Sequence, residues 1–269
     1  MLTFIPRVDN QVDENIQRQA AQKSSTRKNV RHLRIAEIQK SSLTDYPRKI
    51  ACVLFTQRCN LNCPSCCKSQ LIPIPTTDAA ENYDIKDCFK FIDSRIGLVE
   101  SAVITGGEPL LHHDLPALLA HIKKRGLSVK LDTNGTLPHR LHCLIEEGLV
   151  DYVSLEIKAP LFDKALYTKA AGVPVSTDKI IESAALVTAL SPKCEYKTII
   201  LPGFHTLERL GSLIRGLPNT VPHYFQAYAP NRARTEYWQN LPPTTPDKLN
   251  NTVRLLQKSF PSHPLFARH

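Results

Sequence analysis

Apolar residues recur along the chain in two alternating patterns. Short runs rich in β-branched and aromatic residues alternate with segments in which apolar residues return every three or four positions, as on one face of a helix. The runs predict strands at residues 50–56, 101–105, 127–132, 152–157, 194–200 and 223–228. The periodic segments predict helices at residues 84–95, 114–125, 138–147, 178–190, 206–216 and 246–258. Repetition of strand and then helix predicts parallel strands joined by right-handed crossovers.

The number of these units restricts the fold class. Six units are too few for a closed eight-stranded barrel, which leaves an open partial barrel or a doubly wound sheet. We expect an α/β fold, a partial (β/α)6 TIM-like barrel with parallel strands, over residues 35–230. Residues 1–34 are polar and lack periodicity, so they predict a flexible basic extension. Eight of the 20 prolines lie in the last fifth of the chain, which predicts a Pro-rich segment at 231–269 with one helix that wraps the barrel without extending it.

Charge and composition exclude some classes of protein. The 34 Lys and Arg exceed the 25 Asp and Glu, giving a net charge of +9, but residues 1–34 supply four of these charges as a solvated arm. We therefore do not expect nucleic-acid binding. No apolar stretch is long enough to cross a bilayer, and the first residues lack the apolar core of a secretory signal. We expect a cytoplasmic protein that does not bind a membrane.

The eight cysteines divide into two groups. Four crowd into residues 59–67, directly after the first predicted strand, and the others, Cys52, Cys88, Cys143 and Cys194, fall on apolar faces, where a small buried residue is expected. Thiolates at Cys59, Cys63 and Cys66 suit three corners of an iron–sulfur cube and leave the fourth iron open, although Cys67 could take the place of Cys66 or remain free. A zinc site takes its ligands from two pairs as a rule, and no second Cys-x-x-Cys follows. A zinc knuckle and incidental buried cysteines remain as alternatives.

Polar and glycine-rich clusters follow the other predicted strands. Each cluster alone is typical of an ordinary turn or an exposed edge. Because the carboxyl ends of parallel strands lie on one face, however, the clusters are expected to surround a single site. The residues in question are Gly106, Gly107, Glu108, Asp132, Thr133, Asn134, Glu156, Lys158, Gln226 and Tyr228.

Taken together, these motifs resemble those of a known enzyme family. The cysteine triplet and the Gly-Gly-Glu-Pro turn at 106–109 resemble the radical S-adenosylmethionine (SAM) enzymes. Within that superfamily, the segments 42–47 (SLTDYP), 132–135 (DTNG) and 156–158 (EIK) are similar to activating enzymes of glycyl-radical proteins, especially the anaerobic ribonucleotide reductase activating type. The resemblance covers roughly residues 34–230.

The resemblance implies roles for the matched residues. Cys59, Cys63 and Cys66 would hold a 4Fe-4S cluster, whose open iron would be chelated by the amino and carboxylate groups of SAM. Glu108 and the two glycines before it would receive the methionine ammonium. The other matched positions would shape the cofactor pocket and a nearby monovalent-cation site: Asp132, Thr133, Asn134, Glu156 and Lys158.

The sequence departs from the family pattern at three positions, which carry Ser65, Cys67 and Glu156. An aromatic residue, histidine and aspartate, respectively, are more usual there. The first two departures bear on the packing and potential of the cluster, and the third on the cation site.

The resemblance also implies a reaction and its partners. The reduced cluster would pass one electron to SAM, releasing methionine and a deoxyadenosyl radical that abstracts hydrogen from a glycine of a partner enzyme. The partners would be a glycyl-radical enzyme as the protein substrate and a flavodoxin or ferredoxin-type electron donor. One alternative keeps the radical chemistry but takes a nucleobase or tRNA as the substrate. Another, of a different class, is a non-catalytic zinc-binding adaptor.

Overall fold

A computed structural model describes residues 32–71, 83–230 and 233–269. Its strands form one eight-stranded sheet: β1 (Ile35–Ser42), β2 (Ala51–Thr56), β3 (Ser101–Gly106), β4 (Ser128–Thr133), β5 (Tyr152–Glu156), β6 (Cys194–Ile200), β7 (His223–Ala227) and β8 (Leu265–Arg268). Its α-helices are α2 (Ile85–Asp93), α3 (Leu115–Lys124), α4 (Pro138–Glu146), α5 (Lys164–Ala171), α6 (Thr177–Ala189), α7 (Leu207–Arg215), α8 (Glu236–Gln239) and α9 (Pro246–Ser259). Two 3-10 turns complete the elements, η1 (Ser69–Leu71) and η2 (Pro109–Leu111).

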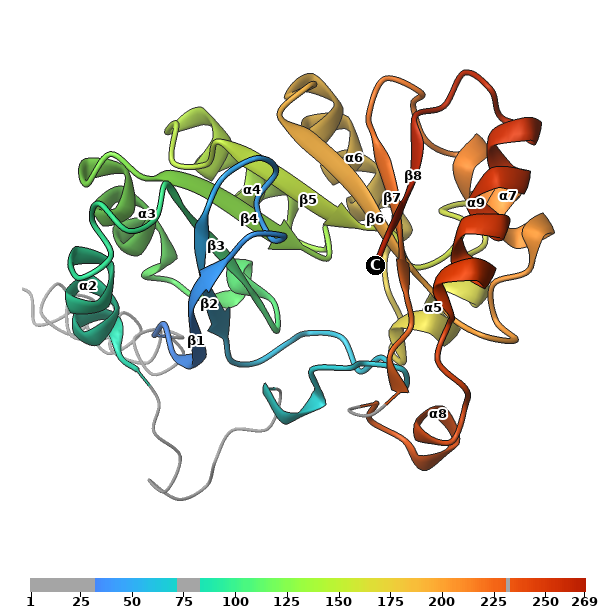
Figure 1. The fold of residues 1–269 in the computed structure, drawn as a ribbon, viewed down its shortest axis with the longest axis horizontal. Coiled ribbons are helices and arrows are strands. Elements are labelled where there is room, and N and C mark those ends of the chain that lie inside the picture. Colours follow the sequence, from blue (N-terminus) through green and yellow to red (C-terminus); the bar gives the residue numbers. More distant parts are fainter. Residues whose placement is uncertain (1–31, 72–82, 231–232) are drawn as a thin grey trace, which may run out of the picture.

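The strands lie in the sheet in the order of the sequence, as Figure 1 shows. Strands β2 to β8 are parallel, and β1 pairs with β2 in antiparallel orientation. A doubly wound sheet would reverse its strand order at a switch point, which this sheet does not do. The expected parallel partial barrel is therefore confirmed.

Each of the six predicted strands and six predicted helices forms within two residues of its expected bounds. The sequence did not indicate β1, α5, α8 or β8. Strand β1 lies at the edge of the sheet and is largely polar, with most of its residues exposed or half-buried. Strand β8 has just four residues. Helix α5 is short, and two of its three buried residues are alanines, so it shows little helical periodicity.

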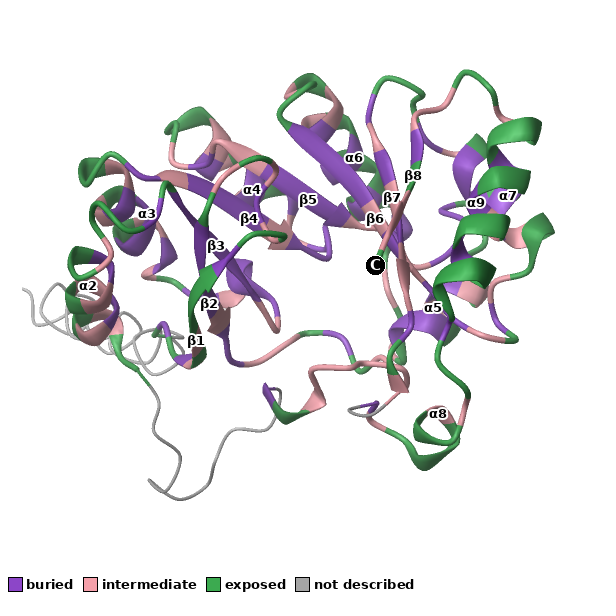
Figure 2. Ribbon diagram, viewed as in Figure 1, coloured by how far each residue is buried: buried purple, intermediate pink, exposed green. Residues whose placement is uncertain are grey.

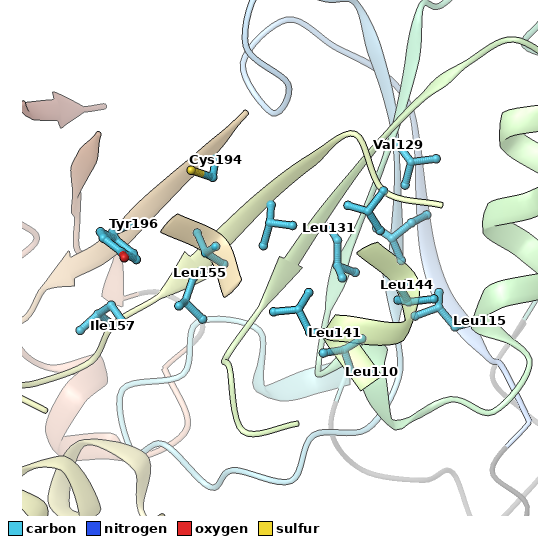
Figure 3. Packing of buried hydrophobic residues seen from close by; sticks show 14 of the residues in the cluster. Leu110, Leu115, Val129, Leu131, Leu141, Leu144, Leu155, Ile157, Cys194 and Tyr196 are labelled. Atoms are coloured by element: carbon cyan, nitrogen blue, oxygen red, sulfur yellow. The ribbon is translucent and has the colours of Figure 1, made fainter. Parts of the chain in front are cut away.

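The apolar core lies between the outer face of the sheet and the helices. Leu131 and Leu155 from two adjacent strands pack with Leu141 from α4 and Tyr196 from β6, as Figure 3 shows. The strands are mostly buried, whereas α7 and α9 turn exposed faces outward (Figure 2). Three of the four isolated cysteines are buried as expected, but Cys143 on α4 is only half-buried, which corrects that prediction.

The ends of the chain correct two further expectations. Residues 1–31 of the expected flexible extension lie outside the described residues. Its end is docked, however, since the Leu33 side chain is buried in the core and its backbone N–H donates to Asp114. At the other end β8 pairs with β7, so the Pro-rich segment extends the sheet, contrary to expectation. It also holds two helices, α8 and α9, where one was expected. No helix in the described ranges is long and apolar enough to cross a membrane.

The inner face of the sheet is charged at β4 and β6, whereas at β2 and β3 it carries a small apolar cluster that includes Val53 and Val103. Side chains alternate along a strand, so Lys130 and Asp132 on β4 point inward while Leu131 between them joins the core. In the same way Glu195 and Lys197 on β6 face the interior. Charged groups can remain there because they pair with one another across the strands.

Candidate active site

A cavity opens at the carboxyl ends of the strands, with about 1200 Å³ of empty space that includes open solvent at its mouth. The structure places ten of the eleven predicted site residues around it: Cys59, Cys63, Cys66, Gly106, Gly107, Asp132, Thr133, Asn134, Glu156 and Lys158. The exception is Glu108, whose side chain is completely buried behind the wall. Strand ends far apart in the sequence therefore meet at one site, as their positions predicted.

The cysteine loop follows β2 and crosses the mouth of the sheet. Helix α5, which ends in Gly172, holds the loop from outside, because the Asn62 N–H donates to the Ala171 carbonyl at 2.9 Å. A Cβ atom on Gly172 would lie 2.0 Å from the Asn62 carbonyl oxygen, so only glycine permits this approach. Within the loop the Cys66 N–H donates to the Cys63 carbonyl at 3.1 Å, forming a turn that directs both thiols into the cavity.

The residues present fit an iron–sulfur cluster. Three soft thiol donors face one cavity that has room beside them for a cofactor. The described part of the chain gathers no three His, Cys, Asp or Glu side chains in a way that would hold a single metal ion. Burial raises the pKa of the Cys59 thiol to about 12 and also raises the pKa values of Cys63 and Cys66. These thiols therefore lose their protons as they bind metal.

The two glycines of the Gly-Gly-Glu-Pro turn serve the packing of the chain. A Cβ atom on Gly107 would lie 1.8 Å from the Arg58 carbonyl oxygen, and one on Gly106 would lie 2.4 Å from the Thr56 nitrogen. The Gly107 N–H donates to the Thr56 carbonyl and the Glu108 N–H donates to the Arg58 carbonyl, at 2.8 Å each. These close approaches join the turn to the end of β2 and fix where the cysteine loop begins.

Glu108 acts as a buried clamp between two strand ends. Its carboxylate accepts hydrogen bonds from the Leu110 N–H at 3.1 Å, the Thr133 hydroxyl at 2.8 Å and the Asn134 N–H at 2.8 Å. Burial raises the pKa of Glu108 to about 7, although these donors oppose the shift. In this conformation Glu108 orients the loop after β4, and its partners Thr133 and Asn134 form the cavity wall in front of it.

Asn134 connects that loop to the cysteines. Its side-chain amide nitrogen donates to the side-chain Oδ1 atom of Asn60 at 3.0 Å and contacts the Cys59 sulfur at 3.9 Å. The Asn60 amide in turn donates to the Thr136 hydroxyl at 2.7 Å. Three hydrogen-bonded side chains thus fix the first cysteine relative to β4.

Buried ion pairs form another part of the cavity wall. Glu156 accepts from the Lys158 ammonium at 2.6 Å, and Asp132 lies 2.6 Å from Lys130 and 3.4 Å from Lys197. These lysines hold the pKa values of both carboxyls below their usual range even though burial opposes this. The structure does not support the expected monovalent-cation site, because ammonium groups already neutralise the two carboxylates.

Sequence reasoning missed several lining residues, among them Asp45, Lys68, Lys197 and His205. The alternation of β6 could have revealed Lys197, which lies two residues after Glu195 on the inner face. No sequence pattern points to His205, which accepts from the Leu201 N–H at 2.9 Å and contacts the Lys158 carbonyl at 3.0 Å. Burial lowers its pKa to about 4, so this ring is neutral and structural.

Positions noted beside the main motifs have mixed outcomes. Ser65, Cys67 and Gln226 line the cavity. Tyr228 does not, because its buried ring turns away and its hydroxyl donates to the Trp238 carbonyl at 2.7 Å. The strand-end pattern therefore identified the site but not the orientation of every side chain.

The partial barrel and its cysteine-lined cavity define a class of protein. The model of the Radical SAM superfamily matches residues 53–261, and the chain belongs to this family. The family implies a 4Fe-4S cluster and SAM as cofactors, which agrees with the three thiols and the adjoining cavity.

Two individual relatives are each less than 30% identical to this chain. The chain is 27% identical over 221 residues to a protein of Methanocaldococcus jannaschii provisionally named a glycyl-radical enzyme activating enzyme, an alignment covering 81% of this chain and 89% of that protein. It is 29% identical over 229 residues to the GTP 3',8-cyclase of Aquifex aeolicus, covering 82% of this chain and 68% of the cyclase.

Solved structures show the same fold at low identity. QueE from Escherichia coli superimposes with a TM-score of 0.52 at 14% identity, over 88% of this chain and 95% of QueE. SuiB from Streptococcus suis bound to S-adenosylmethionine superimposes with a TM-score of 0.57 at 14% identity, over 100% of this chain. This chain spans about half of SuiB, 55% of its length.

Proposed function

We propose that this protein is a radical SAM enzyme of the glycyl-radical activating type, which installs a backbone radical on a partner enzyme. The observation that carries the proposal is the placement of Cys59, Cys63 and Cys66 around one cavity with the strand ends of the sheet. The alignment to the archaeal activating enzyme, which covers 89% of that protein, supports the choice of reaction.

The chain's own residues would bind and orient the cofactors. The three thiolates would bind three irons of a cluster, and the fourth iron would face the remainder of the cavity. With SAM bound there, one-electron reduction would break its bond from sulfur to the adenosyl carbon and supply a deoxyadenosyl radical and methionine. Asp132, Thr133 and Asn134 line the adjoining wall and would contact the cofactor.

The proposed partner is a protein whose glycine reaches the cavity. A sheet of eight strands in sequence order is not closed into a barrel, which leaves room for a polypeptide loop to approach the strand ends. Abstraction of a hydrogen atom from the glycine Cα would produce deoxyadenosine and leave the radical on the partner. A flavodoxin or ferredoxin-type protein would supply the electron.

Anaerobic reconstitution with iron and sulfide, followed by reduction with dithionite in the presence of SAM, tests the chemistry. We expect a brown protein that releases deoxyadenosine. Cys63→Ala is expected to lose both the visible absorbance and product release, whereas the matched variant Cys67→Ser should keep both. A wild-type protein that binds about one zinc and no sulfide would instead support the zinc adaptor. A paramagnetic glycine signal on a glycyl-radical enzyme would identify the partner class.

A nucleotide substrate is the second candidate, favoured by the alignment to GTP 3',8-cyclase. The alignment covers 68% of the cyclase, compared with 89% of the activating enzyme. Deletion of residues 1–30, which removes most of the basic arm, separates the two functions. We expect this truncation to leave activity toward a glycyl-radical partner unchanged, whereas loss of activity would favour a nucleobase or tRNA substrate.

A further inference from the structure

A second hollow adjoins the first, with about 780 Å³ of empty space that includes open solvent. Five segments form its walls: the cysteine loop, the end of α5, the turn after β6, the start of α7, and α8. Figure 1 shows α5 and α8 near one another, below the β7 end of the sheet. The mechanism proposed above does not use this hollow.

The hollow borders the cysteine-lined cavity. Ser65, Ala170 and Leu201 line both spaces, and Pro64 and Ser65 stand between two of the cysteines. A chain segment seated in the hollow would therefore extend directly into the reaction cavity. This shared boundary places the hollow directly beside the reaction cavity.

The lining combines aromatic rings with positive charge. Phe204, Tyr237 and Trp238 supply the rings, and Lys169 and Arg209 supply two cations. None of the lining residues is acidic. Neither cation forms an ion pair within the described ranges, whereas Asp132, Glu156, Lys158 and Lys197 in the main cavity are all paired.

Local contacts preorganise this lining. The Arg209 guanidinium lies 5.7 Å from the centre of the Phe204 ring and donates to the Phe204 carbonyl at 2.7 Å. Trp238 is held at its carbonyl by the Tyr228 hydroxyl, and their rings meet edge to face at 5.8 Å. Side chains that are already fixed lose little conformational entropy when a ligand binds.

We propose that the hollow binds a segment of the protein substrate that carries an acidic side chain next to an aromatic one, and so selects the partner. This inference rests on the proposed function. The carboxylate would pair with Lys169 and Arg209, and the ring would pack against Phe204, Tyr237 and Trp238. The flanking residues would then extend past Ser65 toward the thiols. An electron donor would need a broad surface to dock, whereas this hollow admits single side chains.

Two tetrapeptides test the assignment with the cluster-loaded enzyme: acetyl-Gly-Glu-Phe-Gly-amide and the same peptide with Gln in place of Glu. Trp238 is the only tryptophan of the chain, so its emission reports occupancy of the hollow, and calorimetry gives the affinity. Lys169→Glu reverses a charge in the lining. Lys124→Glu on α3 makes the same change in net charge on an exposed residue at the opposite side of the molecule.

We expect the Glu peptide to bind about fivefold to tenfold more tightly than the Gln peptide and to alter the Trp238 emission, because two exposed cations contribute modestly each. Lys169→Glu should abolish the preference, and Lys124→Glu should keep it. Equal binding of the two peptides, or an unchanged preference in Lys169→Glu, would overturn the proposal. So would Lys169→Glu slowing cluster reduction by flavodoxin while peptide binding stays intact. Deoxyadenosine release by the wild type without peptide tests the proposed function separately.

Discussion

The ion pair between Arg268 and Glu195 gives the most quantitative test of the structure. Arg268 lies on β8, the strand that sequence patterns did not predict, and grips the carboxylate through two hydrogen bonds of 2.7 and 2.6 Å. The Glu195 side chain is 0% exposed. Its other partners are the Tyr152 hydroxyl at 3.2 Å and the Lys130 ammonium at 3.8 Å. Arg268→Met removes the main counter-charge and keeps most of the apolar stem.

The cost follows from what the orphaned carboxylate can do. It can stay charged in a buried site, or it can take up a proton. At pH 7 protonation of a glutamate with an ordinary pKa of about 4.3 costs about 4 kcal/mol, which sets an upper limit on the electrostatic loss. Lys130 recovers part of this, so we expect Arg268→Met to lower the free energy of unfolding by about 3 kcal/mol, in the range for broken buried pairs.

The loss should depend on pH. In the wild type the paired Arg268 holds the pKa of Glu195 below its usual range, so the pair stabilises the fold above about pH 4 and this contribution fades as the pH falls through the folded pKa. In the variant, burial raises the pKa of Glu195, and ionised Glu195 then destabilises the folded state. The difference between the two proteins should therefore shrink to about 1 kcal/mol at pH 5.

Urea and thermal unfolding followed by circular dichroism measure the difference, with both proteins in the same state of metal loading. A loss of about 3 kcal/mol corresponds to a melting temperature lower by roughly 6–12 °C. Glu195→Gln in the Arg268→Met background should restore much of the stability, whereas Arg254→Met on the exposed face of α9 should change it by less than about 0.5 kcal/mol. A loss below about 1 kcal/mol at pH 7, or one that does not vary with pH, would refute the reasoning.

Two other substitutions probe the packing of the site and the titration of the core. Gly107→Ala should lower the free energy of unfolding by more than about 3 kcal/mol or prevent folding, because the new methyl would lie 1.8 Å from the Arg58 carbonyl oxygen. The control Gly97→Ala has positive φ but open space around it, and should lower the free energy of unfolding by about 1 kcal/mol. Equal decreases for the two variants in urea unfolding would contradict this account. Burial beside Thr198 lowers the pKa of His223 to about 3, so the unfolded chain takes up this proton first and stability falls as the pH drops from about 6.5 to 3. His223→Gln should reduce this slope of the free energy of unfolding, measured by urea unfolding, by up to about 1.4 kcal/mol per pH unit. Wild-type and variant curves that run parallel against pH would show that His223 does not titrate in this way.

The fold was predictable wherever burial imposes a pattern. Strands such as β5 and β6 alternate between an apolar outer face and a polar inner face, and the helices that cover them repeat their apolar residues at helical spacing. Edge strands escape this logic because β1 and β8 pair on one side only, so few of their residues need to be apolar. Helix α5 escaped for another reason, since its alanines pack closely without forming a strong apolar stripe.

The site was predictable by position and less so by role. Strand ends placed ten residues around the cavity because topology alone brings them together. Whether Glu108 reaches into that cavity depends on which donors surround it, and the Thr133 hydroxyl and the Asn134 N–H hold it in the wall. Such orientations arise from contacts between residues that are distant in sequence, which no local pattern records.

The choice of substrate must depend on residues outside the shared motif set. The chain is about equally similar to an activating enzyme and to a nucleotide cyclase, at 27% and 29% identity, so features common to both cannot distinguish a protein from a nucleotide. The superfamily implies a cluster and SAM, so the cysteine loop and the strand ends are expected to serve that common chemistry. Helix α8, by contrast, lies between β7 and α9 and contributes Tyr237 and Trp238 to the second hollow. Selectivity is therefore expected to follow changes there, while deoxyadenosine release follows changes at the thiols.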